Sequence, residues 1–118
     1  MHPDLMPLQH VNELDELLSK SGSRPVLLFK HSYSCGISAE ALDELVSHLD
    51  TAQPGKAQYA MITVQTHREL SNAVTAKLGI RHETPQALLV RDGQVVWAAS
   101  HFRVTAQAVG AAISAAAR

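Results

Sequence analysis

Cys35 is the only cysteine of the chain, and its position would make a thiol nucleophilic. It follows an apolar run and a short polar turn, and a helical pattern begins beside it. The unpaired N–H groups and the dipole of a helix start favour a negative charge, so we expect Cys35 to react as a thiolate. Ser32 or Ser34 could cap this helix, and Gly36 would leave room beside the sulfur. We expect Gly36, Ser34 and Ser38 to stabilise the thiolate. The alternative is a buried, inert thiol, which is common for a free cysteine.

Ser38 stands three residues after Cys35, one helical turn further along and on the same side. In a Cys-x-x-Cys enzyme the second cysteine would occupy this position and attack a mixed disulfide from within the protein. A serine cannot do so, although its hydroxyl can stabilise the thiolate through a hydrogen bond. The pair predicts a monothiol cycle, in which Cys35 attacks a disulfide, keeps one half and waits for an external thiol. Ser38 could also be an ordinary polar residue of a first helical turn.

Thr84 and Pro85 come directly before a strand that should lie beside the strand leading to Cys35. A proline at this point cannot donate a hydrogen bond to the ladder. A cis peptide bond there would turn the backbone toward the sulfur and leave a carbonyl and an N–H group for an incoming substrate. We therefore predict that Thr84 and Pro85 bind substrate. The alternative is an ordinary trans proline that opens an edge strand.

Three basic side chains are expected near the sulfur. His31 and His82 fall in the two loops that should flank Cys35, and a nearby imidazolium would favour the thiolate. Lys30 would act in the same way if its ammonium group reached the pocket, although a solvated lysine is the more common outcome at a strand end. The seven histidines lack zinc-type spacing, so no metal site is predicted.

Apolar periodicity and chain breakers predict four helices and four strands. The helices begin at 11, near 35, at 67 and after 105, and the strands span 25–30, 57–64, 87–90 and 94–100. Gly79 is expected to end the third helix, Asp92-Gly93 to form a hairpin turn, and Thr105 to cap the last helix. The first two strands, joined by a helix, should be parallel, and the last two antiparallel.

The expected fold is therefore α/β, in the order α-β-α-β-α-β-β-α. A mixed four-stranded sheet carries helices on both faces, which is a thioredoxin-like architecture in a single domain, 1–118. Hydrophobic residues make up 46% of the 118 residues and the net charge is −1, which argues against a disordered chain and against a nucleic-acid binder with a basic surface. Apolar runs are too short for a membrane span, and the start of the chain lacks the pattern of a signal peptide. A single cysteine fits a reducing, cytoplasmic setting.

The residues around the cysteine resemble a known family. The run Phe29-Lys-His-Ser-Tyr-Ser-Cys-Gly-Ile-Ser38 is similar to the active-site segment of YtxJ-like monothiol bacilliredoxins of the bacillithiol system. Three further segments resemble the same family over a stretch from about 26 to 105. They are Leu70-Ser-Asn-Ala-Val74, Gly79-Ile-Arg-His-Glu-Thr-Pro-Gln86, and Trp97 followed by Ser100-His101-Phe102.

The resemblance implies a thioredoxin-like fold, a cytoplasmic role and removal of bacillithiol, a low-molecular-weight thiol, from mixed disulfides on proteins. It places the nucleophile at Cys35 and the cis proline at Pro85. Bacillithiol would be a co-substrate rather than a bound cofactor. The partners would be bacillithiolated client proteins, bacillithiol and its reductase system, with no nucleic acid and no membrane. Lys30, His31 and His82 are candidate contacts for the negatively charged thiol.

Two alternatives remain open at this point. Gly36 stands where proline is more frequent in the family, and the resulting Cys-Gly-Ile-Ser is close to the Cys-Gly-Phe-Ser of monothiol glutaredoxins that carry an iron–sulfur cluster. A cluster carrier would need two chains and two external thiols to supply four sulfur ligands. The glutaredoxin Gly-Gly pair that binds glutathione is missing here, which favours the bacilliredoxin interpretation. The second alternative is a binding module in which Cys35 is inert.

Overall fold

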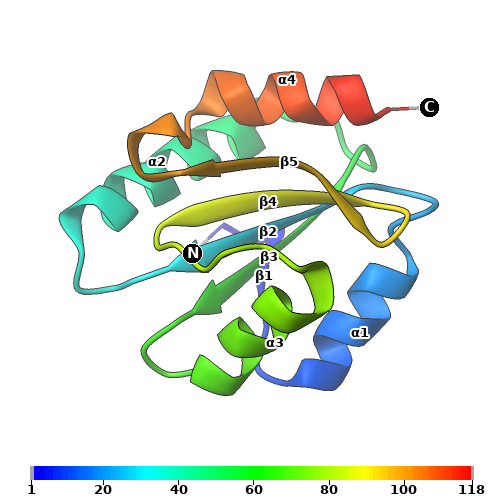
Figure 1. The fold of residues 1–118 in the computed structure, drawn as a ribbon. Coiled ribbons are helices and arrows are strands. Elements are labelled where there is room, and N and C mark those ends of the chain that lie inside the picture. Colours follow the sequence, from blue (N-terminus) through cyan, green and yellow to red (C-terminus); the bar gives the residue numbers. More distant parts are fainter. Residues whose placement is uncertain (1, 118) are drawn as a thin grey trace.

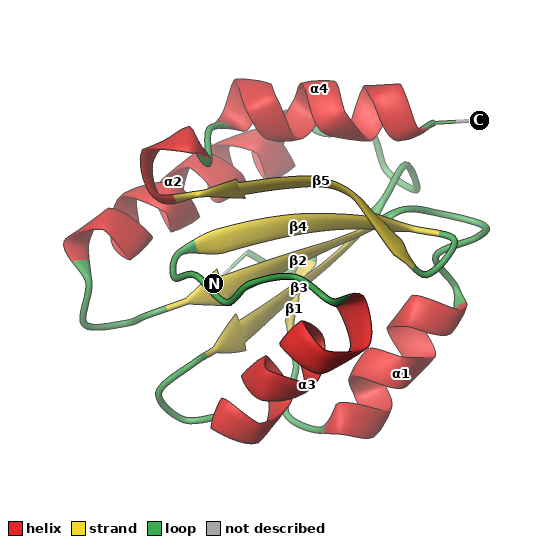
Figure 2. Ribbon diagram, viewed as in Figure 1, coloured by secondary structure: helices red, strands yellow, loops and turns green. Residues whose placement is uncertain are grey.

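The sheet has five strands in the order β1-β3-β2-β4-β5, in a computed structural model that describes residues 2–117 (Figure 1). β3 is parallel to both β1 and β2, whereas β4 is antiparallel to both β2 and β5. Helices α2 and α4 cover one face of the sheet, and α1 and α3 cover the other (Figure 2). The elements are β1 Leu5–Pro7, α1 Val11–Ser19, β2 Val26–His31, α2 Gly36–Thr51, β3 Gln58–Thr63, α3 Arg68–Leu78, β4 Gln86–Arg91, β5 Gln94–Ser100, a 3-10 turn His101–Arg103, and α4 Ala106–Ala116.

The predicted mixed sheet with helices on both faces is confirmed, but the expectation of four strands is wrong by one. The missed strand, β1, has three residues, of which only Leu5 is buried. Met6 and Pro7 are exposed, so the segment shows no alternation that would distinguish it from a loop. β1 forms because it pairs with β3, and that pairing brings together residues more than fifty positions apart.

Several predicted chain breaks lie where the sequence placed them. Gly79 ends α3 in the left-handed conformation, with φ of 63°. Asp92 and Gly93 both have positive φ, at 54° and 75°, as a two-residue hairpin turn requires. The hydroxyl of Thr105 accepts a hydrogen bond from the Ala108 N–H at 3.1 Å and so caps α4.

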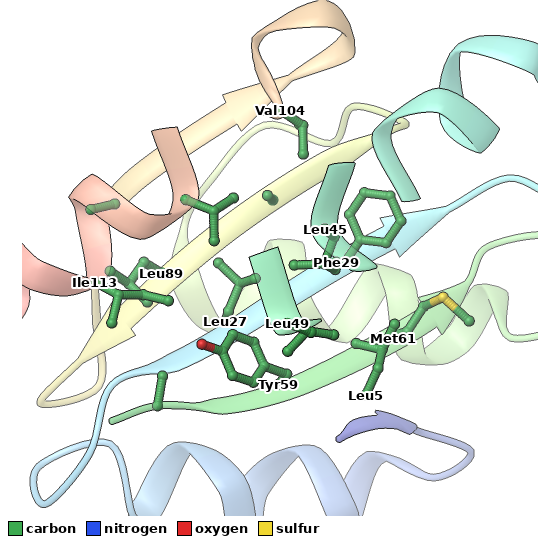
Figure 3. Close-up of a cluster of buried hydrophobic side chains, with 14 of the residues drawn as sticks. Leu5, Leu27, Phe29, Leu45, Leu49, Tyr59, Met61, Leu89, Val104 and Ile113 are labelled. Atoms are coloured by element: carbon green, nitrogen blue, oxygen red, sulfur yellow. The ribbon is translucent and has the colours of Figure 1, made fainter. Parts of the chain in front are cut away.

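β2 is the central strand, and its side chains alternate between two separate cores. Leu27 and Phe29 point toward α2 and α4, into the core shown in Figure 3, whereas Val26 and Leu28 point toward α1 and α3. All four side chains are completely buried. Because both faces are covered, the strand lacks the polar alternation of a surface strand.

The last two residues of β2 continue this alternation with polar side chains. Lys30 lies on the α3 side and bonds to Thr75 of α3, and His31 lies on the α2 side and bonds to Ser38 of α2. At this edge the end of β2 meets the start of β4 and the end of β5, since Lys30 pairs with Gln86 and Gln86 with Ser100. The turn before α2 and the loop before β4 therefore meet at one edge of the sheet (Figure 1).

Candidate functional site

Cys35 occupies the N-cap position of α2. Its backbone is extended, with φ of −116° and ψ of 122°, and its carbonyl accepts the first helical hydrogen bond from the Ala39 N–H at 3.1 Å. The side chain makes no cap hydrogen bond and is partly exposed. Cys35 therefore stands beside the unpaired N–H groups at the start of a 16-residue helix, a position at which these groups and the helix dipole attract negative charge.

The serines of the turn do not cap the helix, so that expectation is wrong. Cys35 itself takes the cap position, and Ser32 and Ser34 bond to a residue that the sequence did not single out, Gln65. The Gln65 amide nitrogen donates to the Ser32 hydroxyl at 2.5 Å and to the Ser34 hydroxyl at 3.0 Å. Its carbonyl oxygen accepts a weaker bond from the Tyr33 N–H at 3.4 Å. The turn is thus held by the loop between β3 and α3.

Gly36 is the first residue of α2, and a Cβ atom added there would have nothing within 4 Å. No atom of another part of the described structure crowds this position. The predicted roles of Gly36 and Ser34 at the thiolate stay predictions.

Ser38 is completely buried directly beneath this turn. Its hydroxyl accepts a hydrogen bond from the Ser32 N–H at 2.9 Å and shares a second bond of 2.8 Å with Nδ1 of His31. The Ser32 carbonyl in turn accepts from the Cys35 N–H at 3.4 Å. Ser38 is therefore linked to the nucleophile through the backbone of Ser32, and a direct bond from its hydroxyl to the thiolate stays a prediction. Burial lowers the pKa of His31, which favours a neutral ring in this bond.

The Thr84–Pro85 peptide bond is cis, as the family resemblance implied. Pro85 is buried, and its carbonyl accepts a hydrogen bond from the His101 N–H at 3.0 Å. Thr84 is only partly buried, and within residues 2–117 neither its backbone N–H nor its carbonyl has a hydrogen-bond partner. Thr84 thus presents two free backbone groups at the edge where Cys35 lies. A role in binding substrate stays a prediction for both residues.

Lys30 differs from both expectations, since it is neither solvated nor placed to contact a ligand. The residue is 0% exposed, and its ammonium group bonds to the Thr75 hydroxyl at 3.2 Å and to Nδ1 of His82 at 3.0 Å. Burial lowers the pKa of Lys30. The lysine is drawn inward because β2 is covered by α3 at this point. His82, which is exposed, also bonds through Nε2 to the Thr84 hydroxyl at 3.1 Å.

Gln86, the first residue of β4, is a second supporting residue that the sequence analysis missed. It is buried, and its amide nitrogen donates to the Arg81 carbonyl at 3.0 Å while its oxygen accepts from the Glu83 N–H at 3.4 Å.

The site has two walls, one on each of the two segments that meet at this edge of the sheet. We call residues 32–35 the turn wall and residues 81–85 the loop wall. The bonds of Gln65 to Ser32 and of Lys30 to His82 join residues 33 and 52 positions apart, which is why the sequence alone did not reveal these supports.

Exposed aromatic side chains and a groove lie on the elements next to Cys35 in the sequence and in the sheet. Tyr33 is 66% exposed and Phe102 is 70% exposed. A groove of about 500 Å³ runs between α2 and the 3-10 turn, and Ile37 and Phe102 are among its lining residues.

Within residues 2–117, no group of three or more histidine, cysteine or acidic side chains could hold a metal ion. No helix in the same range is long and apolar enough to cross a membrane.

Residues 6–109 match the family of the monothiol bacilliredoxin BrxC. The chain belongs to this family. The match covers both walls of the site and most of the domain, so the bacilliredoxin resemblance of the sequence is confirmed. It also favours the first of the three interpretations of Cys35, that of a redox-active cysteine.

Solved structures show that this bacilliredoxin-family chain has a thioredoxin-like oxidoreductase fold. One, described as a candidate oxidoreductase with a thioredoxin fold, has a TM-score of 0.81 at 26% identity and covers 92% of this chain and 93% of that chain. A thioredoxin from Malassezia sympodialis has a TM-score of 0.74 at 16% identity, with coverage of 95% and 90%. A mutant thioredoxin from Halobacterium salinarum has a TM-score of 0.75 at 21% identity, and the match covers 100% of this chain and 96% of that chain. The two thioredoxins are similar in fold alone.

Proposed function

We propose that this protein removes bacillithiol, a negatively charged low-molecular-weight thiol, from mixed disulfides on other proteins, with Cys35 as the nucleophile. The observation that carries the proposal is the site of a partly exposed Cys35 at the N-cap of α2, in a chain with no second cysteine. Membership of the monothiol bacilliredoxin family supports bacillithiol as the small thiol.

The lack of a second cysteine determines the order of the reaction. The position of a resolving cysteine is held by Ser38, which is buried and already bonded to Ser32 and His31. A mixed disulfide on Cys35 therefore has no internal thiol to attack it. An external thiol must complete the cycle, which makes a small, abundant thiol the natural second substrate.

The cycle consists of two thiol–disulfide exchanges. The Cys35 thiolate attacks the bacillithiol sulfur of the protein mixed disulfide, so that a Cys35–bacillithiol bond forms while the client sulfur leaves as a thiolate and is protonated by water. A second bacillithiol thiolate then attacks the bacillithiol sulfur of the adduct. Bacillithiol disulfide leaves, and Cys35 is again a thiolate. In one turnover the client thiol is restored, one free bacillithiol is consumed and one bacillithiol disulfide is formed, so a separate reductase must restore the small thiol.

The proposed setting follows from this chemistry. Both the thiolate of Cys35 and the pool of reduced bacillithiol require a reducing compartment, so we place the protein in the cytoplasm. Its partners would be client proteins that carry bacillithiol and the system that reduces bacillithiol disulfide. The free backbone groups of Thr84 would bind the extended segment of the mixed disulfide next to the sulfur, since strand-like pairing needs one N–H and one carbonyl.

Mass spectrometry of the intact protein tests the proposal. Reduced protein is mixed with a client that carries a bacillithiol mixed disulfide, and the reaction is stopped by acid at short times. We expect a single adduct with the mass of bacillithiol on Cys35 and a free thiol on the client. Added bacillithiol should then remove the adduct.

Two control reactions, one with a Cys35 variant and one with a different small thiol on the client, show whether the adduct reflects the proposed function. The Cys35→Ser variant should form no adduct and leave the client unchanged while keeping the wild-type melting temperature. A client carrying glutathione instead of bacillithiol should react more slowly. If Cys35→Ser frees the client at the wild-type rate, or if the wild type forms no adduct, the proposed function is wrong.

A further inference from the structure

Lys30 has no carboxylate partner within residues 2–117, although it is completely buried. Its two bonding partners, Thr75 and His82, provide a hydroxyl oxygen and a ring nitrogen. A buried charge without a counter-charge is costly, and an apolar side chain would fill the same space without that cost. A role in the site that outweighs this cost would explain the lysine.

The bonds of Lys30 determine the direction of the hydrogen bonds beyond it. An ammonium group is only a donor, so Nδ1 of His82 must be the acceptor in the 3.0 Å bond. The neutral ring then carries its proton on Nε2, which donates to the Thr84 hydroxyl oxygen at 3.1 Å. The oxygen of the Thr84 hydroxyl thus accepts a hydrogen bond from the His82 ring. Its own proton remains free for a different acceptor.

The charges around His82 agree with a neutral ring. Burial and then the ammonium group of Lys30 lower the pKa of His82, and the carboxylate of Glu83 opposes them with a smaller effect. α3 contributes Thr75, which bonds to the same ammonium group. The net effect lowers the pKa of His82, so its ring is neutral although it lies next to the ammonium group of Lys30.

Thr84 is the residue at which this chain of bonds reaches the site. It directly precedes the cis Pro85, and its backbone N–H and carbonyl are unpartnered within the described residues. Gln86, which follows Pro85, pairs with Lys30 across β2 and β4, so Thr84 lies two residues from the strand partner of Lys30. A substrate that meets the backbone of Thr84 also meets its hydroxyl.

We propose that Lys30 and His82 are positioning residues that make the Thr84 hydroxyl a hydrogen-bond donor and give the loop wall its preference for an anionic small thiol. The proposal rests on the proposed function and names the class of thiol that the site selects. An anionic group next to Thr84 gains a donor and the field of a buried cation, whereas a cationic group meets repulsion. The two thiol–disulfide exchanges of the proposed cycle take place as described above, and only the preference among small thiols depends on these residues.

Three mixed disulfides of one client test this inference. The small thiols are 3-mercaptopropionate, 2-mercaptoethanol and cysteamine, which are similar in size but anionic, neutral and cationic. For the wild type we expect kcat/KM to fall in that order, with about a tenfold difference between the anionic and the cationic thiol. Lys30→Met should bring the three values close together. Lys77→Met, which removes an exposed lysine of α3 that pairs with Asp15, should keep the wild-type order.

Variants of Thr84 give a test that does not depend on changing a buried residue. Thr84→Val should lose the preference for the anionic thiol, and Thr84→Ser should retain it. Nitrogen NMR of the imidazole rings should show the proton of His82 on Nε2 in the wild type. A proton on Nδ1 of His82, or an unchanged preference in both Lys30→Met and Thr84→Val, would overturn the inference.

The two proposals fail in different ways. A wild-type protein that reacts with none of the three mixed disulfides, nor with the bacillithiol client, contradicts the proposed function. A wild-type protein that reacts with all three at the same rate contradicts only the role of Lys30, His82 and Thr84.

Discussion

The turn wall and the loop wall are supported from opposite faces of the sheet by neighbouring residues of β2. His31 supports the turn wall through Ser38 on the α2 side, and Lys30 supports the loop wall through His82 on the α3 side. The first network consists of hydroxyl, amide and imidazole groups, which satisfy one another locally. The second is built on a buried cation.

The difference indicates two separate tasks. A neutral, fully bonded network fixes geometry at little electrostatic cost, which suits the wall that carries the nucleophile. A buried charge does not add rigidity in proportion to its cost, but its field extends beyond the atoms it touches. The turn wall would therefore set the rate for every disulfide, and the loop wall would set the choice among small thiols.

The largest effect is expected from Ser38→Ala, which breaks the turn wall. The change leaves the Ser32 N–H and Nδ1 of His31 without their shared partner, at a cost of about 2 kcal/mol in the free energy of unfolding. Thermal or denaturant unfolding measures this cost. The rates for anionic, neutral and cationic thiols should fall by a common factor. Ser47→Ala, which changes an exposed serine further along α2, is the control, and a selective loss for one thiol would contradict the division between the walls.

Lys30→Met should instead stabilise the protein, by about 1–2 kcal/mol, because a buried charge is replaced by an apolar side chain of similar length. The gain should depend on pH. Burial lowers the pKa of Lys30 from 10.5, so in the wild type the folded state releases its proton before the unfolded state does.

Stability of the wild type should accordingly rise with pH between the lowered pKa of Lys30 and 10.5, and this rise should be missing in Lys30→Met. Urea unfolding at a series of alkaline pH values measures it. A variant that is less stable than the wild type at neutral pH would show that Lys30 is needed for folding rather than for selectivity.

Gln65→Glu tests a weaker support of the turn wall. The carboxylate keeps an acceptor for the Tyr33 N–H but cannot donate to the hydroxyls of Ser32 and Ser34. Because these groups are near solvent, the loss of stability should be less than about 1 kcal/mol. The transfer rate should fall modestly and equally for all three thiols. An unchanged rate would show that Ser38 and His31 support the turn wall without Gln65.

Tyr59→Phe should leave both walls untouched and serves as a reference for the alkaline experiments. Burial, with a smaller effect of Asp4, raises the pKa of Tyr59 to about 12. Between pH 10 and about 12 the unfolded state ionises while the folded state does not, so stability of the wild type should fall there. Tyr59→Phe should remove this fall, and its transfer rates should equal those of the wild type. Altered thiol selectivity would show that the walls are not independent of the core.

Local pattern was enough to predict the helix that starts beside Cys35, because that helix depends on residues close in sequence, whereas the cis bond before Pro85 was expected from the family resemblance. The burial of Lys30 was not predictable in this way, since its partners lie 45 and 52 residues away and are brought in by the packing of α3. The same holds for Gln65, which is 33 residues from Ser32. β1 was missed because three residues are too few to show a period.

The alternation of side chains along β2 has a consequence for engineering this protein. A single residue inserted into the strand would carry the amine of Lys30 over to the helix that begins at Cys35 and the ring of His31 to the opposite layer, where neither would find its acceptor. Extra residues should be tolerated in exposed loops, but not between 26 and 31. A transplant of this chemistry into another scaffold would have to carry strand, turn and first helical turn as one uninterrupted cassette.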